Sequence, residues 1–179
     1  MIEPYSDDPG NLGLYVTPLE VLEKYCRRAY EHGYAVATHC IGDGANRETL
    51  KIYARILEGE NDRRWRIEHS QIIHPDDFHY FGDYNIVPSV QTTHATSDMY
   101  WAEDRLGSER ILGAYAWVSL LESGARLALG SDFPVEEVNP MLGIHAAVTR
   151  QDTEGWPEGG WYPAESLSRE EAVRGFTLD

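Results

Sequence analysis

Residues 34–46, Tyr-Ala-Val-Ala-Thr-His-Cys-Ile-Gly-Asp-Gly-Ala-Asn, hold the first complete junction between a predicted strand and a predicted helix. Tyr34 to His39 is a short apolar run with a polar end, which predicts a buried strand. Gly42 to Asn46 predicts a turn into a helix that ends at Gly59, because apolar residues then recur with helical spacing. In parallel α/β folds, functional groups lie at such junctions, so His39 is the first candidate for a functional residue.

The same alternation of helix and strand signals continues on both sides of this junction. Upstream, Thr17-Pro18-Leu19-Glu20 supplies an N-cap, a proline at N1 and an acid for a helix that Gly33 closes. Further strands are expected at Trp65 to Glu68, near Ile86 to Val90, and at Arg126 to Gly130. Further helices are expected at Pro75 to Tyr80, from Ser108 to Gly124, from Asn139-Pro140 to about Arg150, and after a Ser168/Glu171 capping box. Strands alternating with such helices indicate a parallel sheet, so the predicted class is α/β.

The composition limits the partners that the chain can bind. With 179 residues, 42% of them hydrophobic, one domain with a real core is expected. A net charge of −15 would repel phosphate backbones and anionic lipid, so we expect a small-molecule partner, no nucleic acid and no membrane. The sequence has no apolar run that approaches the roughly 20 residues of a membrane span and no signal-peptide pattern, so a soluble, cytoplasmic protein is expected. Cys26 and Cys40 are predicted to be buried thiols.

Three of the four predicted strands end near a polar residue that a hydrophobic core would not select. The endings are Ala-Thr-His39, Arg-Ile-Glu-His69 and Leu-Gly-Ser-Asp132. Because catalytic groups gather at the carboxyl ends of parallel strands, we expect these side chains to converge on one site. Imidazoles and a carboxylate suit zinc or a similar divalent ion. Each residue alone has a plainer explanation, a hydrogen-bonded core histidine or a turn-capping aspartate, but three such strand ends together favour a metal or catalytic site.

Four longer motifs surround these residues. They are His39-Cys-Ile-Gly-Asp-Gly-Ala-Asn46, Arg66-Ile-Glu-His-Ser-Gln71, Pro88-Ser-Val-Gln-Thr-Thr-His-Ala-Thr-Ser-Asp98 and Gly130-Ser-Asp-Phe-Pro-Val-Glu136. In their order and spacing they resemble amidohydrolase family 3, a family of TIM-barrel metal-dependent hydrolases that includes N-substituted formamide deformylases. The resemblance covers nearly the whole chain. Thr92 and Gly44 depart from it at positions where a proline and a basic residue are common, which affects the expected substrate pocket more than the fold.

The resemblance implies a role for each candidate residue. His39 and His69 would end strands 5 and 6 of a (β/α)8 barrel and bind a divalent metal, zinc foremost, present as one or two ions. Asp132 would end strand 8, bind the other metal position, and act as the general base for water in the hydrolysis of an amide or other non-peptide C–N bond. His94 and Asp98 would contact a small amide-type substrate. A solvated loop histidine and a loop-capping aspartate are the alternatives for these two residues.

Parts of the family's site are missing from the sequence. The family also uses a His-x-His pair from strand 1 and usually a carboxylated lysine or an acid from strand 4, whereas the chain has no His-x-His and its two lysines lie in predicted helices. We therefore expect residues 1–179 to be the C-terminal half of a barrel, strands 5 to 8 with their helices, truncated at both ends. The chain could be an inactive piece of an enzyme, half of an enzyme completed by an N-terminal half or a homo-oligomer, or a non-catalytic binding module. The intact trio of metal-ligand-type residues speaks against the last hypothesis.

Overall fold

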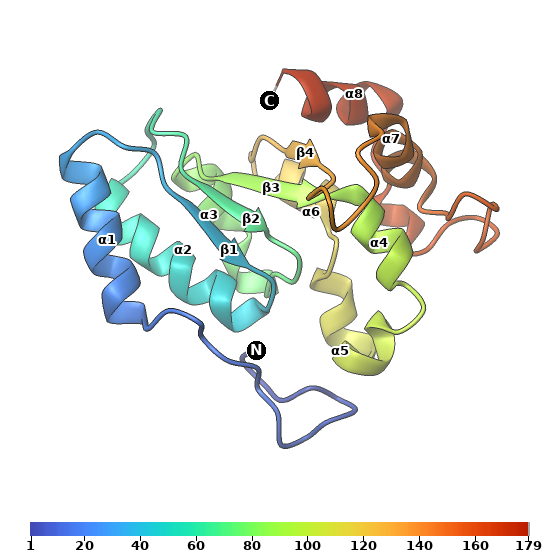
Figure 1. Ribbon diagram of the computed structural model, residues 1–179, viewed down its shortest axis with the longest axis horizontal. Helices are drawn as coiled ribbons and strands as arrows, with labels where there is room; N and C mark the ends of the chain where they lie inside the picture. Colours follow the sequence, from blue (N-terminus) through green and yellow to red (C-terminus); the bar gives the residue numbers. More distant parts are fainter. Residues whose placement is uncertain (179) are drawn as a thin grey trace.

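The computed structural model describes residues 1–178, which fold around a four-stranded parallel sheet (Figure 1). The strands are β1 (Ala37–Cys40), β2 (Arg66–His69), β3 (Val87–Gln91) and β4 (Ala128–Gly130). Their order in the sheet is β1-β2-β3-β4, and all three pairings are parallel. Each strand therefore lies beside the next strand along the chain, and the predicted α/β class with a parallel sheet is confirmed.

Helices follow each strand and cover the sheet. Four of these helices are α2 (Asp43–Leu57), α3 (His79–Asp83), α6 (Trp117–Glu122) and α8 (Arg169–Thr177). The others are α1 (Leu19–Glu31), α4 (Thr92–Asp98), α5 (Ala102–Arg110), α7 (Pro140–Thr149) and the 3-10 turns η1 (Pro75–Asp77), η2 (Ile111–Gly113) and η3 (Pro163–Glu165). Figure 1 shows α1 and α2 beside β1 and α7 and α8 beyond β4. No helix among the described residues has the length and apolar character that crossing a membrane requires.

One face of the sheet packs against the helices and forms the hydrophobic core. Cys40, Ile67 and Val90 are buried there, as the two-residue period of a strand requires, and so is Leu127, which directly precedes β4. Tyr53 of α2 reaches the same face, where its hydroxyl lies 2.7 Å from Thr38 Oγ1 and donates a hydrogen bond of 3.2 Å to the carbonyl of Arg66. The core is therefore built from the strand residues that point towards the helices.

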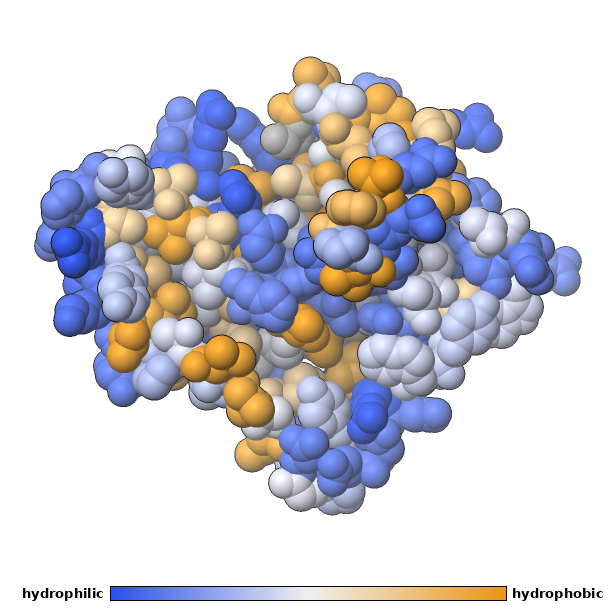
Figure 2. Space-filling model, viewed as in Figure 1, coloured by the Kyte–Doolittle hydropathy of each residue, from blue (hydrophilic) through white to orange (hydrophobic). Residues whose placement is uncertain are grey.

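The opposite face of the sheet is polar and open. His39 pairs with Glu68, Glu68 with Ser89, and Ser89 with Ala128, so one row of neighbours crosses all four strands. All four residues of this row are exposed or half-buried. In the view of Figure 1 the strands are seen without a helix in front of them, and Figure 2 shows hydrophilic residues over this part of the molecule, next to hydrophobic ones. The sheet is thus covered on one face only within the described residues.

The predicted long helix from Ser108 to Gly124 is wrong. The chain forms α5, the turn η2 and α6 instead, and the segment between them pairs with the loop after β2. Ile73 N donates to the carbonyl of Gly113 at 2.8 Å, and Tyr115 N donates to the carbonyl of Gln71 at 2.8 Å. A Cβ at Gly113 would lie only 2.1 Å from Ile73 O, so the glycine allows this approach. Tertiary hydrogen bonds therefore override a helical pattern of apolar residues.

The other differences lie at element boundaries. The first strand starts at Ala37 instead of Tyr34, and Thr17 does not cap α1, because Pro18 is the N-cap residue and no side chain bonds there. Helix α4 is not predicted by the sequence, since its residues Thr-Thr-His-Ala-Thr-Ser-Asp have no apolar stripe. The predicted caps at Asn139 and at Ser168 with Glu171 are confirmed. The boundaries around α4 matter most, because this helix carries a residue of the candidate site.

Candidate metal centre

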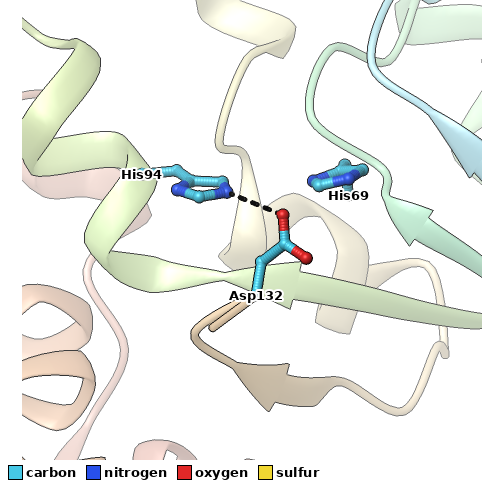
Figure 3. A group of neighbouring side chains, drawn as sticks. All are labelled: His69, His94 and Asp132. Carbon is cyan, nitrogen blue, oxygen red and sulfur yellow. Dashed lines mark ion pairs between the residues drawn. The ribbon is translucent and has the colours of Figure 1, made fainter. Parts of the chain in front are cut away.

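Two imidazoles and one carboxylate meet beyond the carboxyl ends of the strands (Figure 3). The potential ligand atoms of His69, His94 and Asp132 all lie within 4.8 Å of one another. His69 is the last residue of β2, His94 lies in the first turn of α4 directly after β3, and Asp132 follows β4. The parallel sheet brings the three together because it places these chain positions at the same edge.

The backbone of His69 turns out of the regular strand. His69 pairs with Cys40, so a regular strand would point its side chain to the helix-covered face. Its φ is 72°, and Ser70 follows with a φ of 42°, both in the left-handed region that non-glycine residues rarely adopt. Ser70 Oγ donates to the carbonyl of Ile67 at 3.1 Å and thereby closes the turn. Such left-handed residues gather at functional sites, and here the turn brings the imidazole into the cluster.

Asp132 also has a left-handed backbone, with a φ of 54°. It starts a turn after β4, in which Val135 N donates to the carbonyl of Asp132 at 2.8 Å. The side chain of Asp132 is 42% exposed, so it is the member of the cluster that an approaching molecule meets. One of its carboxylate oxygens, Oδ2, lies 3.9 Å from Nε2 of His94. Asp132 therefore joins the loop after β4 to the histidines at the ends of the neighbouring strands.

His94 bridges two carboxylates. Its Nε2 faces Asp132, as the dashed line in Figure 3 shows, and its Nδ1 lies 3.0 Å from Oε1 of Glu136. The ring of His94 stacks on the ring of His69, with centroids 5.8 Å apart and an angle of 16° between the planes. Only 12% of the His94 side chain is exposed. The sequence predicts His94 as a substrate contact, whereas the geometry places it among the potential metal ligands.

His39 stands next to the cluster. Its ring centroid lies 4.3 Å from that of His69, with the planes 69° apart, but His39 does not belong to the group of mutually close ligand atoms. The predicted trio is therefore brought together only in part: His69 and Asp132 meet, and His94 occupies the third position. The signal that could have found His94 is its place just after the remaining strand, since all four strands are followed or ended by a metal-ligand-type residue.

Asp98 lies in a second layer of polar groups. Its Oδ2 accepts a hydrogen bond of 2.6 Å from the hydroxyl of Tyr115 and one of 3.4 Å from Nε2 of Gln71. Burial raises the pKa of Asp98 above its ordinary value, and the Tyr115 hydrogen bond opposes the increase. The charge of His94 also lowers the pKa of this carboxyl group, and the charge of Glu136 raises it. The predicted role of Asp98 in substrate binding stays a prediction.

The protonation of His69 suits metal binding. Burial lowers the pKa of His69, and the neighbouring His39 adds to the decrease, while the charge of Asp132 opposes it. A lowered pKa leaves the imidazole neutral at neutral pH, which is the form that binds metals. In addition, Nδ1 of His69 is buried and has no hydrogen-bond partner among residues 1–178. An unpaired buried nitrogen beside a second imidazole and a carboxylate fits a divalent cation of the zinc type.

Asn46 holds the turn after β1 against the loop after β2. The two hydrogens on Nδ2 of this fully buried side chain are shared among the carbonyls of Cys40, Ile41, Gly42 and Ile72, which lie 3.1 to 3.2 Å from the nitrogen. The turn carries His39 at its start, and the loop follows His69. The sequence places Asn46 in a turn but does not predict this bridge, because Ile72 is far along the chain.

Comparisons with known proteins place the chain in a family. Residues 1–179 match the amidohydrolase family. The chain is 40% identical over 179 residues to Protein LONG AFTER FAR-RED 3 of Arabidopsis thaliana, covering 98% of the chain and 30% of that protein. It is 35% identical over 175 residues to the putative amidohydrolase YtcJ of Bacillus subtilis (strain 168), covering 98% of the chain and 33% of that protein. The chain thus spans about a third of the length of these relatives.

Two solved structures resemble the fold. An uncharacterized metal-dependent hydrolase from Pyrococcus horikoshii OT3 superposes with a TM-score of 0.85 at 29% identity, over 97% of the chain and 34% of that protein. An uncharacterized metal-dependent hydrolase from Pyrococcus furiosus gives a TM-score of 0.82 at 30% identity, again over 97% of the chain and 34% of that protein. Because the family match extends from the first residue to the last and the structural neighbours are metal-dependent hydrolases, the chain belongs to the amidohydrolase family.

Proposed function

We propose that the chain is the metal-binding part of a hydrolase that cleaves amide or other non-peptide C–N bonds of small molecules. The observation that carries the proposal is the cluster of His69, His94 and Asp132, whose ligand atoms lie within 4.8 Å of one another at the carboxyl edge of a parallel sheet. Membership of the amidohydrolase family and the metal-dependent hydrolases among the structural neighbours support the class of reaction. The substrate is proposed only as a class, because fold alone does not determine it.

Each residue of the cluster has a proposed role in holding the metal. His69 and His94 supply neutral nitrogen donors, and Asp132 supplies a negatively charged oxygen, a set that suits zinc foremost. His39 is proposed as a further ligand, because its ring lies against that of His69 and would serve a second ion or a higher coordination number. The proposal therefore allows one or two ions.

The chemistry divides between the ion and the protein. When bound, a divalent cation supplies Lewis-acid chemistry, which lowers the pKa of water and polarises a carbonyl oxygen. Asp132 accepts a proton from the attacking water while the water oxygen bonds to the carbonyl carbon. It then returns that proton to the leaving nitrogen as the C–N bond breaks. Its exposure of 42% leaves it within reach of a substrate. Asp98, held by Tyr115 and Gln71, is proposed as a substrate contact.

We also propose that the sheet is strands 5 to 8 of a (β/α)8 barrel. The sequential order β1-β2-β3-β4 is the order of a barrel segment, and the polar row from His39 to Ala128 would then face the barrel interior. Both edge strands pair on one side only within the described residues, and the chain spans about a third of its relatives. An N-terminal half or a second copy of the chain would complete the barrel. The cytoplasmic location expected for the chain stays a prediction.

Zinc titration tests the metal site. We expect the metal-free chain to bind zinc in calorimetry, and His69→Ala and Asp132→Asn to weaken binding by at least about 10-fold, since each loses a ligand. His79→Ala is the matched control, because His79 is an exposed histidine on α3 outside the cluster. It should bind zinc as the unaltered chain does. Absence of zinc binding by the unaltered chain would contradict the proposal and favour a non-catalytic binding module.

An activity assay separates the remaining hypotheses. Zinc-loaded chain is incubated with N-formyl and N-acetyl anilides while its oligomeric state is followed by sedimentation. An incomplete piece of an enzyme should show no turnover as a monomer. Turnover that appears only with self-association would favour completion by a second copy, and turnover by the monomer would contradict the idea that the barrel must be completed.

A further inference from the structure

Glu136 contacts two residues of α4, His94 and Ser97, and His94 belongs to the candidate metal centre. Its Oε1 lies 3.0 Å from Nδ1 of His94 and accepts a hydrogen bond of 2.7 Å from the hydroxyl of Ser97. The side chain of Glu136 is 22% exposed. His94 and Ser97 are three residues apart on α4 and therefore neighbours on one side of the helix. The loop after β4 is thus tied to α4 at the position from which His94 enters the cluster.

The contact determines which nitrogen of His94 is free. A carboxylate oxygen can only accept a hydrogen bond, so Nδ1 of His94 must carry the hydrogen that is shared with Glu136. In a neutral ring this leaves the lone pair on Nε2, the nitrogen that faces Asp132 at 3.9 Å. Metal-binding histidines commonly donate their second N–H to a carboxylate, which orients the ring and selects its tautomer.

Other carboxylates nearby do not have this geometry. Oδ2 of Asp98 accepts from Tyr115 and Gln71, and Asp132 faces the opposite nitrogen of the His94 ring. Ser97 donates to the same Glu136 oxygen that His94 approaches, so Glu136 is itself held in place. Together with Asp132, Glu136 gives the cluster a second negative charge, which matches the charge of a divalent cation.

We infer that Glu136 is a positioning residue, which holds His94 in the tautomer with a free Nε2 and aims this nitrogen into the cluster. The inference rests on the proposed metal site for its consequence, but the tautomer itself exists without metal. Loss of Glu136 should therefore change the ring of His94 in the metal-free chain and weaken metal binding in the loaded one.

Nitrogen NMR of the histidine ring tests the inference directly. In metal-free chain at about pH 8, where an unperturbed imidazole is neutral, the spectrum of His94 should show a hydrogen on Nδ1. Glu136→Ala should shift the His94 ring towards the tautomer mixture of a free imidazole, and Glu136→Gln should do so in part, because an amide can donate to Nδ1 as well as accept from it. Glu137→Gln is the matched control, because Glu137 is the exposed next residue and should leave the spectrum unchanged. Two variants keep the test usable if one of them does not fold.

Metal affinity provides the second measurement. Glu136→Ala should weaken zinc binding by about 10–100-fold, the usual effect of removing a carboxylate behind a metal-bound histidine, whereas Glu137→Gln should not. An unchanged His94 tautomer in folded Glu136 variants would overturn the inference, whatever the zinc affinity. If the unaltered chain binds no zinc but its His94 tautomer depends on Glu136, the proposed metal function fails while the positioning role stands.

Discussion

The two faces of the sheet differ in what they contribute. On the helix-covered face, Ile67, Val90 and Leu127 are at most 2% exposed, whereas His39, Glu68 and Ser89 on the other face are exposed or half-buried. Both sets alternate along the same strands, because successive side chains of a strand point to opposite faces. The same short strands thus carry the hydrophobic core on one side and a polar, chemically able surface on the other.

The candidate metal centre lies where the two faces meet, at the carboxyl ends of the strands. There the side chains are held less by apolar packing than by polar contacts, such as those of Asn46 with four carbonyls and of Glu136 with His94 and Ser97. Substitutions on the helix-covered face should therefore change stability, and substitutions at the strand ends should change metal binding. Three predictions test this division.

The largest effect on stability is expected on the helix-covered face. Ile67→Ala should lower the free energy of unfolding by about 2–5 kcal/mol, because it opens a cavity in a core where this side chain is completely buried. Ser89→Ala, on the open face of β3, should change it by less than about 0.5 kcal/mol. Urea unfolding of the metal-free variants measures both values. Equal losses would show that the open face is packed in solution, as it would be if a second copy of the chain covered it.

The helix-covered face is also the part of the fold that the sequence predicts well. Apolar runs and caps predict the four strands and α2, α7 and α8 to within a few residues. The sequence fails between Gly113 and Tyr115, where hydrogen bonds to the distant residues Gln71 and Ile73 end the helical pattern. It fails also at α4, whose polar residues are held by contacts with the loop after β4. Local patterns cannot contain such long-range contacts.

An intermediate effect is expected from Asn46→Ala, because this side chain supports both the fold and the site. Removing its amide withdraws the side-chain donor from the carbonyls of Cys40 and Ile72, while those of Ile41 and Gly42 keep backbone donors, and should cost about 1–3 kcal/mol of stability. It also weakens the link between the turn after β1 and Ile72, whose N–H still donates to the carbonyl of Ile41, so zinc affinity should fall. Urea unfolding and calorimetry measure the two effects.

Asn61→Ala is the matched control, since Asn61 likewise bonds two carbonyls, those of Gly59 and Tyr84, but lies before β2 and away from the cluster. It should lose stability and keep its zinc affinity. If Asn46→Ala also kept its zinc affinity, the bridge would be purely structural.

The site itself is only partly predictable from the sequence. His69 and Asp132 are found because they follow apolar strands, which is a local signal. The place of His94 depends on α4, which the sequence does not predict, and its contact with Glu136 joins residues 42 positions apart. The left-handed backbone of His69 is likewise invisible in the sequence, since only glycine signals such a conformation reliably. Residue types at strand ends therefore predict that a site exists, and the tertiary structure decides its members.

The smallest effect on stability is expected from the pH dependence of His69, measured with a chelator present. Burial and His39 lower the pKa of His69 in the folded chain, so the unfolded chain binds a proton more readily. Stability should then fall as the pH drops below about 6.5, the value of an unperturbed histidine, and level off below the folded pKa. The effect is small because Asp132 opposes the shift. His69→Gln should remove this part of the acid dependence, while His79→Gln, at an exposed site, should retain it. The free energy of unfolding could instead have the same slope against pH for all three chains between pH 7 and pH 5. The imidazole of His69 would then be as well solvated as that of an exposed histidine, and the site would lie on the open face instead of at the boundary of the core.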